Sequence, residues 1–155
     1  ERLPDRVATL SRSGTVFAAL ERADPDAVLV AESRPGREGV GVAEHLARAT
    51  DADVTITTDA AFADRLAATG VDAVVVGADA LGPDGSVLNK AGTRGAAAAA
   101  ASEGVDCFVV AARDKVATTD ALDREERAVV TEAGVLDAAG VRAVAEELRA
   151  TADWE

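Results

Sequence analysis

The sequence predicts an α/β fold in which a parallel sheet is covered by helices on both faces. Five apolar, β-branched runs alternate with helical segments along the 155 residues, which is the pattern of a parallel sheet. Hydrophobic residues make up 48% of the chain but aromatic residues only 3%, so the core must be built from Ala, Val and Leu. We therefore expect residues 1–155 to form one α/β domain.

In the first half of the chain we expect two strands, each followed by a helix. Asp24-Pro25-Asp26 breaks the first helix, and a run of small and apolar residues follows each loop. The expected elements are a strand over 6–10, a loop over 11–14, a helix to about 23, a strand over 28–31, a flexible connection over 36–41 and a helix over 42–50.

The second half continues the alternation and then weakens. Asp59 is placed to cap a helix, and the alanine run 96–101 is helical by composition. Trp154 could dock the tail or belong to an interface. The expected elements are strands over 53–58, 71–77 and 107–111, helices over 60–69 and from Gly92-Thr93 through the alanine run, a turn at 83–85, a solvated charged run over 123–127, a short edge strand at 129–130 and a closing helix over 141–150.

Charge and composition exclude some partners. Acidic residues outnumber basic ones by 28 to 16, for a formal charge of -12, so neither direct nucleic-acid binding nor an anionic membrane surface is expected. Of the basic residues only Lys90 and Lys115 are lysines. An acidic surface poor in lysine indicates either adaptation to salt (a halophilic protein) or a codon bias toward high GC content.

The cysteine and methionine content bears on where the protein is found in the cell and on whether the sequence is part of a longer chain. Cys107 is the single cysteine, so no internal disulfide can form, and we expect a cytoplasmic protein. No apolar run is long enough to span a membrane and no signal-peptide pattern is present. The sequence contains no methionine, which favours a piece of a longer chain.

Candidate site residues follow the predicted strands, at the edge where open α/β sheets bind ligands. Asp79 follows the buried run 74–76, and Glu32 and Arg34 follow the second strand. Arg suits forked recognition of phosphate. The Ser11 to Gly14 loop and the helix start at Gly92-Thr93 offer backbone N–H groups to an anion. Asn89 and Lys90 add an amide and a cation just before that helix.

Some of these candidates have a purely structural alternative. Ser13 with Gly14 could be an ordinary helix N-cap and turn. Glu32 and Arg34 could pair with each other. His45 lies in a helix of mixed polarity without a metal-binding partner, and Cys107 is expected to be a small buried apolar residue. The sequence predicts no metal site and no cofactor.

Five motifs, in order, resemble one family. They are Thr9-Leu10-Ser11-Arg12-Ser13-Gly14-Thr15-Val16, Val30-Ala31-Glu32-Ser33-Arg34-Pro35 with Gly39, Asp59-Ala60-Ala61, Val76-Gly77-Ala78-Asp79 and Asn89-Lys90-Ala91-Gly92-Thr93. The chain resembles the translation initiation factor 2B alpha/beta/delta family, which includes methylthioribose-1-phosphate isomerase and ribose-1,5-bisphosphate isomerase. The resemblance implies a Rossmann-like C-terminal domain, normally preceded by an N-terminal helical domain, and oligomers formed through this domain with identical or related subunits.

The resemblance also implies a catalytic mechanism, and this sequence differs from the isomerase pattern at two positions. In the isomerases of the family, a cysteine of the first motif and the aspartate of the Gly-Ala-Asp motif move hydrogen between neighbouring sugar carbons. Asp79 matches the aspartate, but Ser11 stands at the cysteine position, and a hydroxyl is far less acidic than a thiol. Glu38 stands where the isomerases commonly have a glutamine. Both departures weaken the interpretation as an isomerase.

Three functions follow from these observations. The first is an initiation factor 2B-like subunit whose pocket binds a phosphorylated sugar or nucleotide as a regulatory ligand, through Ser13, Gly14, Glu32, Arg34, Asn89, Lys90, Gly92 and Thr93. The alternative is an aldose-ketose isomerase acting on a phosphorylated ribose, with Asp79 and Ser11 as its catalytic pair. A third interpretation is a structural subunit with a vestigial pocket.

Overall fold

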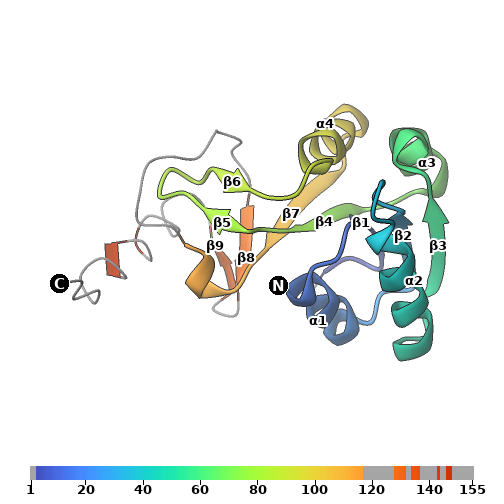
Figure 1. The fold of residues 1–155 in the computed structure, drawn as a ribbon, viewed down its shortest axis with the longest axis horizontal. Coiled ribbons are helices and arrows are strands. Elements are labelled where there is room, and N and C mark those ends of the chain that lie inside the picture. The colour runs from blue at the N-terminus through green and yellow to red at the C-terminus, as the bar shows by residue number, and fades with distance from the viewer. Residues whose placement is uncertain (1–2, 117–127, 132–133, 137–142, 144–145, 148–155) are drawn as a thin grey trace. The chain divides into compact units, whose positions relative to one another are not determined.

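The computed structural model describes residues 3–116, 128–131, 134–136, 143, 146 and 147. The chain divides into two compact units, residues 1–76 with 91–107 and residues 77–90 with 108–155. Figure 1 shows the ribbon coloured along the chain. The charged run 123–127, Trp154 and most of the closing helix predicted over 141–150 lie outside the described residues.

The first unit is built on parallel strands. They are β1 (Arg6–Leu10), β2 (Ala27–Ala31), β3 (Asp53–Thr57) and β4 (Ala73–Gly77), in the spatial order β3-β2-β1-β4, and β7 (Asp106–Val110) follows β4 in that order. The register pairs Leu10 with Ala31 and Ala31 with Thr57. The carboxyl ends of β1, β2 and β3 are therefore level, and the residues that follow them meet at one edge.

Helices cover both faces of these strands. The helices α1 (Gly14–Ala23) and α2 (Glu38–Ala49) lie on one side, and α3 (Phe62–Thr69) and α4 (Thr93–Glu103) on the other (Figure 1). All five residues of β4 are buried, as a strand covered on both faces requires. The fold class predicted from the sequence, a Rossmann-like parallel sheet between two layers of helices, is confirmed.

The alanine run lets α4 pack closely on its neighbours, α3 among them. Ala96, Ala97 and Ala100 are buried, and the other alanines of the run are exposed or partly exposed. Alanine carries little bulk and has the highest helix propensity. The helix begins at Thr93, as the sequence predicts, and extends to Glu103.

The helix after β2 begins earlier than the sequence predicts. We expected a flexible connection over 36–41, but α2 starts at Glu38 and contains both Gly39 and Gly41. A Cβ on Gly39 would overlap the carbonyl oxygen of Ala31 and lie 2.9 Å from its carbonyl carbon. Gly39 therefore permits close approach of the helix to the end of β2, rather than flexibility.

The prediction that Asp59 caps the next helix is wrong. A short 3-10 turn, η1 (Asp59–Ala61), precedes α3, and the side chain of Thr58 accepts the hydrogen bond from the backbone N–H of Ala61. Threonine is itself a good N-cap residue. The Asp59 carboxylate is left available for another contact, which is described with the site below.

The second unit contains a short hairpin and the end of the sheet. Strands β5 (Ala80–Leu81) and β6 (Val87–Leu88) pair antiparallel, and Asp84 in the turn between them accepts hydrogen bonds from the backbone and hydroxyl of Ser86. Strand β8 (Ala128–Thr131) pairs parallel with β7, and β9 (Gly134–Leu136) pairs antiparallel with β8. The predicted strand at 129–130 is confirmed, although β9 lies beyond it. A 3-10 turn, η2, spans Arg113–Lys115.

The structure also shows the surroundings of His45 and Cys107, to which the sequence analysis gave no functional role. His45 is exposed, and its ring contacts that of Phe17 edge-on with 4.1 Å between ring centroids. Cys107 is partly exposed, not buried as predicted. In the described part of the chain, no helix has the length and apolar character needed to cross a membrane.

Candidate functional site

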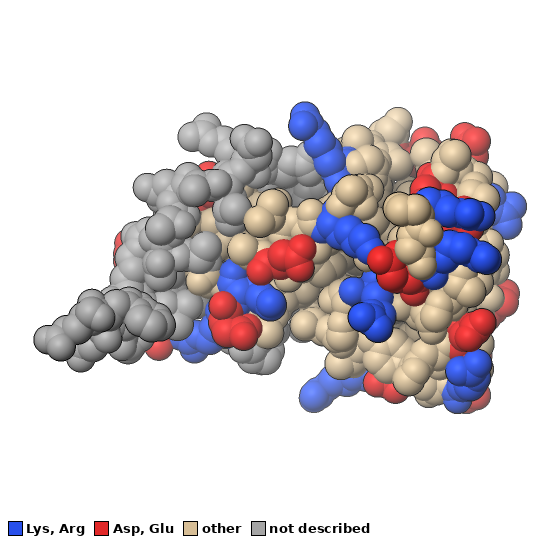
Figure 2. Space-filling model, in the orientation of Figure 1, with Lys and Arg blue, Asp and Glu red and all other residues tan. Residues whose placement is uncertain are grey.

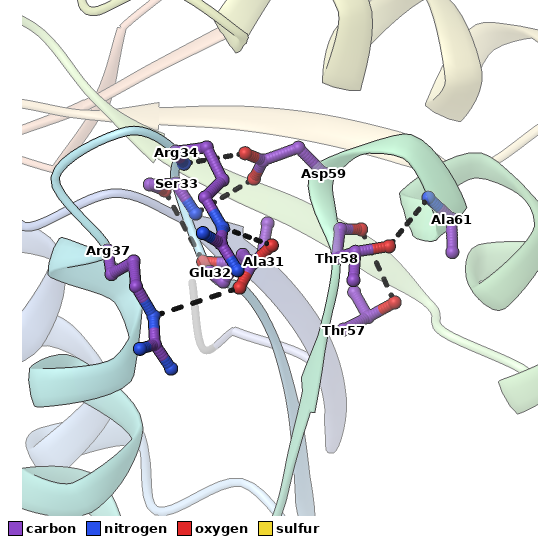
Figure 3. Close-up of polar contacts among 9 residues, drawn as sticks. All are labelled: Ala31, Glu32, Ser33, Arg34, Arg37, Thr57, Thr58, Asp59 and Ala61. Carbon is purple, nitrogen blue, oxygen red and sulfur yellow. Dashed lines mark hydrogen bonds and ion pairs between the residues drawn. The ribbon is translucent and has the colours of Figure 1, made fainter.

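Five residues that follow β1, β2 and β3 form a connected group, which we call the strand-end cluster. Its members are Ser11 after β1, Glu32, Ser33 and Arg34 after β2, and Asp59 after β3. The level register of the three strands brings the loops after them together. Figure 3 shows the contacts around β2 and β3.

Two serines join the ends of β1 and β2. The backbone N–H of Ser11 donates to Oγ of Ser33 over 2.6 Å, and the Ser33 hydroxyl donates to the carbonyl of Ala31 over 3.3 Å. Both serines are buried and both have left-handed backbone, with φ of 61° and 60°. Non-glycine residues in that region are uncommon and cluster at functional sites. The loops at this edge therefore have a defined shape.

The carboxylate of Asp59 holds the loop after β2. Its Oδ1 accepts from the backbone N–H of Ser33 at 2.8 Å, and its Oδ2 accepts from that of Arg34 at 2.6 Å. Both bonds are visible in Figure 3. Hydrogen bonds to an ionised acceptor are shorter and stronger than those between neutral groups, so this carboxylate replaces water for two consecutive backbone groups.

Glu32 holds two arginines at the same edge. Its side chain is only 11% exposed, and it pairs with Nε of Arg34 at 2.9 Å and with Nε of Arg37 at 4.0 Å. The arginine side chains are 63% and 57% exposed. The hydrogen bond and the negative charge of Glu32 raise the pKa of Arg34 above its ordinary value. A permanently charged side chain is thus held by Glu32 while most of its surface is open to solvent, and Figure 3 shows its contact with Glu32.

Two helices begin beside the cluster. Oγ of Ser13 accepts from the backbone N–H of Val16, so Ser13 is the N-cap of α1. The structural alternative for this residue is confirmed. A Cβ on Gly14 would meet no atom within 4 Å, whereas one on Gly92 would meet the side chain of Leu10 at 3.1 Å. The start of α4 at Gly92 and Thr93 therefore lies against the end of β1.

Glu38 lies in the first turn of α2, directly after the loop that follows β2. Its carboxylate packs over Gly36, where an added Cβ would lie 2.6 Å from the carboxyl carbon. The side chain is partly buried. The residue that departs from the isomerase pattern is thus close to the loop that carries Arg34.

The second unit holds the other predicted residues. Asp79 is exposed, and its backbone N–H donates to the carbonyl of Leu88 over 2.8 Å. Because Ala80 pairs with Leu88 in the hairpin, Asp79 and Asn89 extend its two strands side by side. Asn89 and Lys90 are partly exposed. Within this unit the structure brings Asp79 and Asn89 together, and within the first unit it links Ser11, Glu32 and Arg34.

Sequence reasoning missed two members of the strand-end cluster and a third residue, Arg37, that pairs with it. Ser33 and Arg37 were not singled out, and Asp59 was expected to be a cap. A serine between two charged residues carries no pattern that reveals a left-handed backbone. The spacing of Glu32 and Arg37, five positions apart across a proline, also gives no helical or strand periodicity.

A small cavity lies away from these residues. It has a volume of about 100 Å³ and is lined by residues that include Arg6, Ala27 and Asp53, which begin β1, β2 and β3, and Thr69 at the end of α3. Those are the amino ends of the strands. Open α/β sheets bind ligands at the carboxyl ends, so we place the candidate site at the strand-end cluster.

Fold and site together define a class of proteins, and comparison with known proteins identifies it. The sequence profile of the initiation factor 2 subunit family matches residues 3–152. This match extends over nearly the whole chain, and the chain therefore belongs to the initiation factor 2 subunit family.

Individual relatives include isomerases and an initiation factor. The chain is 35% identical over 147 residues to a ribose 1,5-bisphosphate isomerase of Haloterrigena turkmenica, covering 83% of this chain and 44% of the relative. It is 32% identical over 137 residues to a methylthioribose-1-phosphate isomerase of Pseudomonas entomophila, covering 86% and 37%. The structure of the Pyrococcus horikoshii OT3 translation initiation factor eIF-2B is similar, with a TM-score of 0.70, 27% identity, and coverage of 86% of this chain and 50% of that one. The chain thus spans half or less of each of these proteins.

Proposed function

We propose that the protein binds a phosphorylated ribose at the strand-end cluster. The observation that carries this proposal is the Arg34 side chain, which is 63% exposed while the buried Glu32 carboxylate binds its Nε. A planar guanidinium held in one orientation is suited to paired hydrogen bonds with phosphate oxygens. Two isomerases similar to this chain are named for phosphorylated ribose substrates, which supports that ligand class.

The helix starts next to the cluster support an anionic ligand as well. The N-termini of α1 and α4 carry partial positive charge from their aligned peptide groups. Gly14 and Gly92 present backbone without a side chain there, which allows a phosphate to approach the N–H groups. Within the second unit, Asn89 and Lys90 offer an amide and a cation, the groups that the sequence predicts for ligand binding.

Two uses of this binding site are proposed, and each has its own support. Ser11 in place of the isomerases' cysteine favours a regulatory pocket in an initiation factor 2B-like subunit. The names of the curated relatives favour an aldose-ketose isomerase, in which Asp79 moves the proton between neighbouring sugar carbons. In either use we expect assembly with identical or related subunits.

The test is a calorimetric titration of the full-length protein with ribose 1,5-bisphosphate, methylthioribose 1-phosphate and a nucleoside monophosphate. We expect Arg34→Gln to weaken binding of the phosphorylated ribose about tenfold or more, because a hydrogen bond to a charged group contributes about 1.5–3 kcal/mol.

The matched control is Arg48→Gln on α2, where Arg48 pairs with Glu44 across one helical turn and is 74% exposed. This variant should bind like the wild type. If the wild-type protein binds none of the three compounds, the pocket is vestigial and the proposed function is wrong.

A further inference from the structure

Within the strand-end cluster, Asp59 binds the main chain of the loop after β2. It lies two residues beyond the end of β3, and its two carboxylate oxygens accept from the consecutive backbone N–H groups of Ser33 and Arg34. The capping task of this position is performed by Thr58. The carboxylate is thus committed to the loop after β2.

The next contact carries this restraint to β1. Ser33, whose N–H is bound by Asp59, presents its Oγ to the backbone N–H of Ser11 at 2.6 Å. Both serines are buried in left-handed backbone. Such conformations persist only where the surroundings hold them. The contacts of Asp59 and Ser33 do so here, together with the hydrogen bond that the backbone N–H of Arg37 donates to the carbonyl of Ser33 over 2.8 Å.

The result is a line of hydrogen bonds across the ends of three strands, from Asp59 through Ser33 to Ser11. The same carboxylate also binds the N–H of Arg34, the residue proposed to contact phosphate. Asp59 itself lies just after β3, at the end of this line, and its oxygens accept hydrogen bonds from backbone groups. A negative charge in this role restrains the loop without having to contact an anionic ligand.

We propose that Asp59 is a positioning residue that sets the backbone at Ser11 and the guanidinium of Arg34 for ligand binding. The part that concerns the ligand rests on the proposed function. The part that concerns the loops stands on geometry alone, so the two can be tested separately.

Amide hydrogen exchange in the full-length protein tests the loop geometry. We expect Asp59→Ala to accelerate exchange at Ser33, Arg34 and Ser11 by about tenfold or more, while an amide within β2, such as that of Leu29, stays unchanged. Ser33→Ala should accelerate exchange at Ser11 but leave Arg34 protected, because Asp59 still binds the Arg34 N–H. Unchanged exchange at Ser11 in Asp59→Ala would overturn the proposal.

Binding of ribose 1,5-bisphosphate tests the functional part. Asp59→Ala should weaken binding about tenfold, equivalent to about 1.4 kcal/mol, and Asp59→Asn should lie between it and the wild type, because the amide keeps one acceptor oxygen. The control is Asp51→Ala, at an exposed acid in the bend before β3.

The two failures are distinguishable. If the wild type binds no phosphorylated ribose, the proposed function fails and the exchange measurement still decides the role of Asp59 in the loops. If the wild type binds and Asp59→Ala binds equally tightly, Asp59 does not position the site.

Discussion

At the scale of the residue, the site depends on short polar side chains that bond to backbone. Ser33 supplies an acceptor to the N–H of Ser11, and Asp59 accepts from two N–H groups. Glu32 acts differently, since it fixes the charged side chains of Arg34 and Arg37. These few contacts define both the shape of the loops and the charge that they present.

The charge state of Arg34 gives no pH dependence in the neutral range. Glu32 raises the pKa of Arg34, and a group whose pKa is raised on folding contributes stability below its unfolded pKa and loses it only as the pH rises through the folded value. For an arginine that window lies above a pH of about 12. Any change in binding near neutral pH must come from the ligand or from other groups.

Replacing the oxygen of the Ser11 side chain by sulfur, in Ser11→Cys, tests whether the protein is a catalyst. If the protein is an isomerase that lacks its thiol, Ser11→Cys should raise turnover of ribose 1,5-bisphosphate about tenfold or more, because a thiol ionises at a pH of about 8.5 and a hydroxyl does not. Turnover is followed by phosphorus NMR of substrate and product in the full-length protein.

The second part of this test uses Asp79 and Cys107. Adding Asp79→Asn should abolish the gain, whereas Cys107→Ser alone should change nothing. No gain in Ser11→Cys, with binding intact, would favour the regulatory interpretation over the catalytic one.

At the scale of the element, the approach of α2 to β2 fixes the loop between them. The N–H of Gly39 donates to the carbonyl of Glu32 over 3.2 Å, and no side chain fits between the helix and Ala31. The loop from Glu32 to Arg37 is therefore anchored at both ends, by the sheet and by the start of the helix. This anchoring places Arg34 and Arg37 on either side of Glu32.

Two glycines of the same helix offer a matched pair of variants. Gly39→Ala should lower the free energy of unfolding by about 1–3 kcal/mol or more, because the helix must move away from β2. Gly41→Ala, where an added Cβ meets no atom within 4 Å, should raise it by about 0.5–1 kcal/mol through helix propensity. Chemical denaturation measures both. Equal effects in the two variants would contradict the close packing described here.

The sequence predicted the elements well where periodicity was strong and poorly where contact between elements decided the outcome. The buried strand at Val74–Val76 and the alanine helix are identified by side chains alone. The start of α2 is not, because two glycines resemble a loop until the carbonyl of Ala31 is known to lie against one of them. Likewise, Thr58 and Asp59 are both plausible caps, and only the neighbouring loop decides which residue takes that role.

For the candidate site, too, the sequence indicated some residues and missed others. The strand ends indicated Ser11, Glu32 and Arg34, and the structure links these residues through Ser33 and the loop after β2. Their role as ligand contacts stays a prediction. The roles of Ser33 and Arg37 could not be read from the chain, because a left-handed backbone and an ion pair across a proline leave no periodic signal. The assignment of Asp79, Asn89 and Lys90 to the same ligand stays a prediction.

At the scale of the whole molecule, charge is the dominant property. The chain has a formal charge of -12, and the face shown in Figure 2 carries acidic and basic side chains side by side on the described residues. Excess negative charge opposes compaction through self-repulsion. Any anionic ligand must therefore be drawn by local groups such as Arg34 and Arg37 rather than by the protein as a whole.

Salt should accordingly stabilise the protein. We expect the thermal midpoint to rise steeply as KCl increases toward 1 M, where the screening length falls to about 3 Å. A protein adapted to salt should continue to gain stability beyond that concentration, whereas one whose acidity reflects codon bias should level off. Circular dichroism melts over a KCl series distinguish the two. A midpoint that falls on adding salt would contradict the role of self-repulsion.

The way in which Asp59 binds the loop has a consequence for how this site can diverge. Both of its hydrogen bonds go to main-chain N–H groups, which every residue except proline provides. The side chain at position 34 can therefore be replaced without removing the Asp59 restraint, whereas that of Ser33 also holds the backbone N–H of Ser11. The main-chain restraint and the side chain that we propose to contact phosphate can thus change independently of each other at this edge.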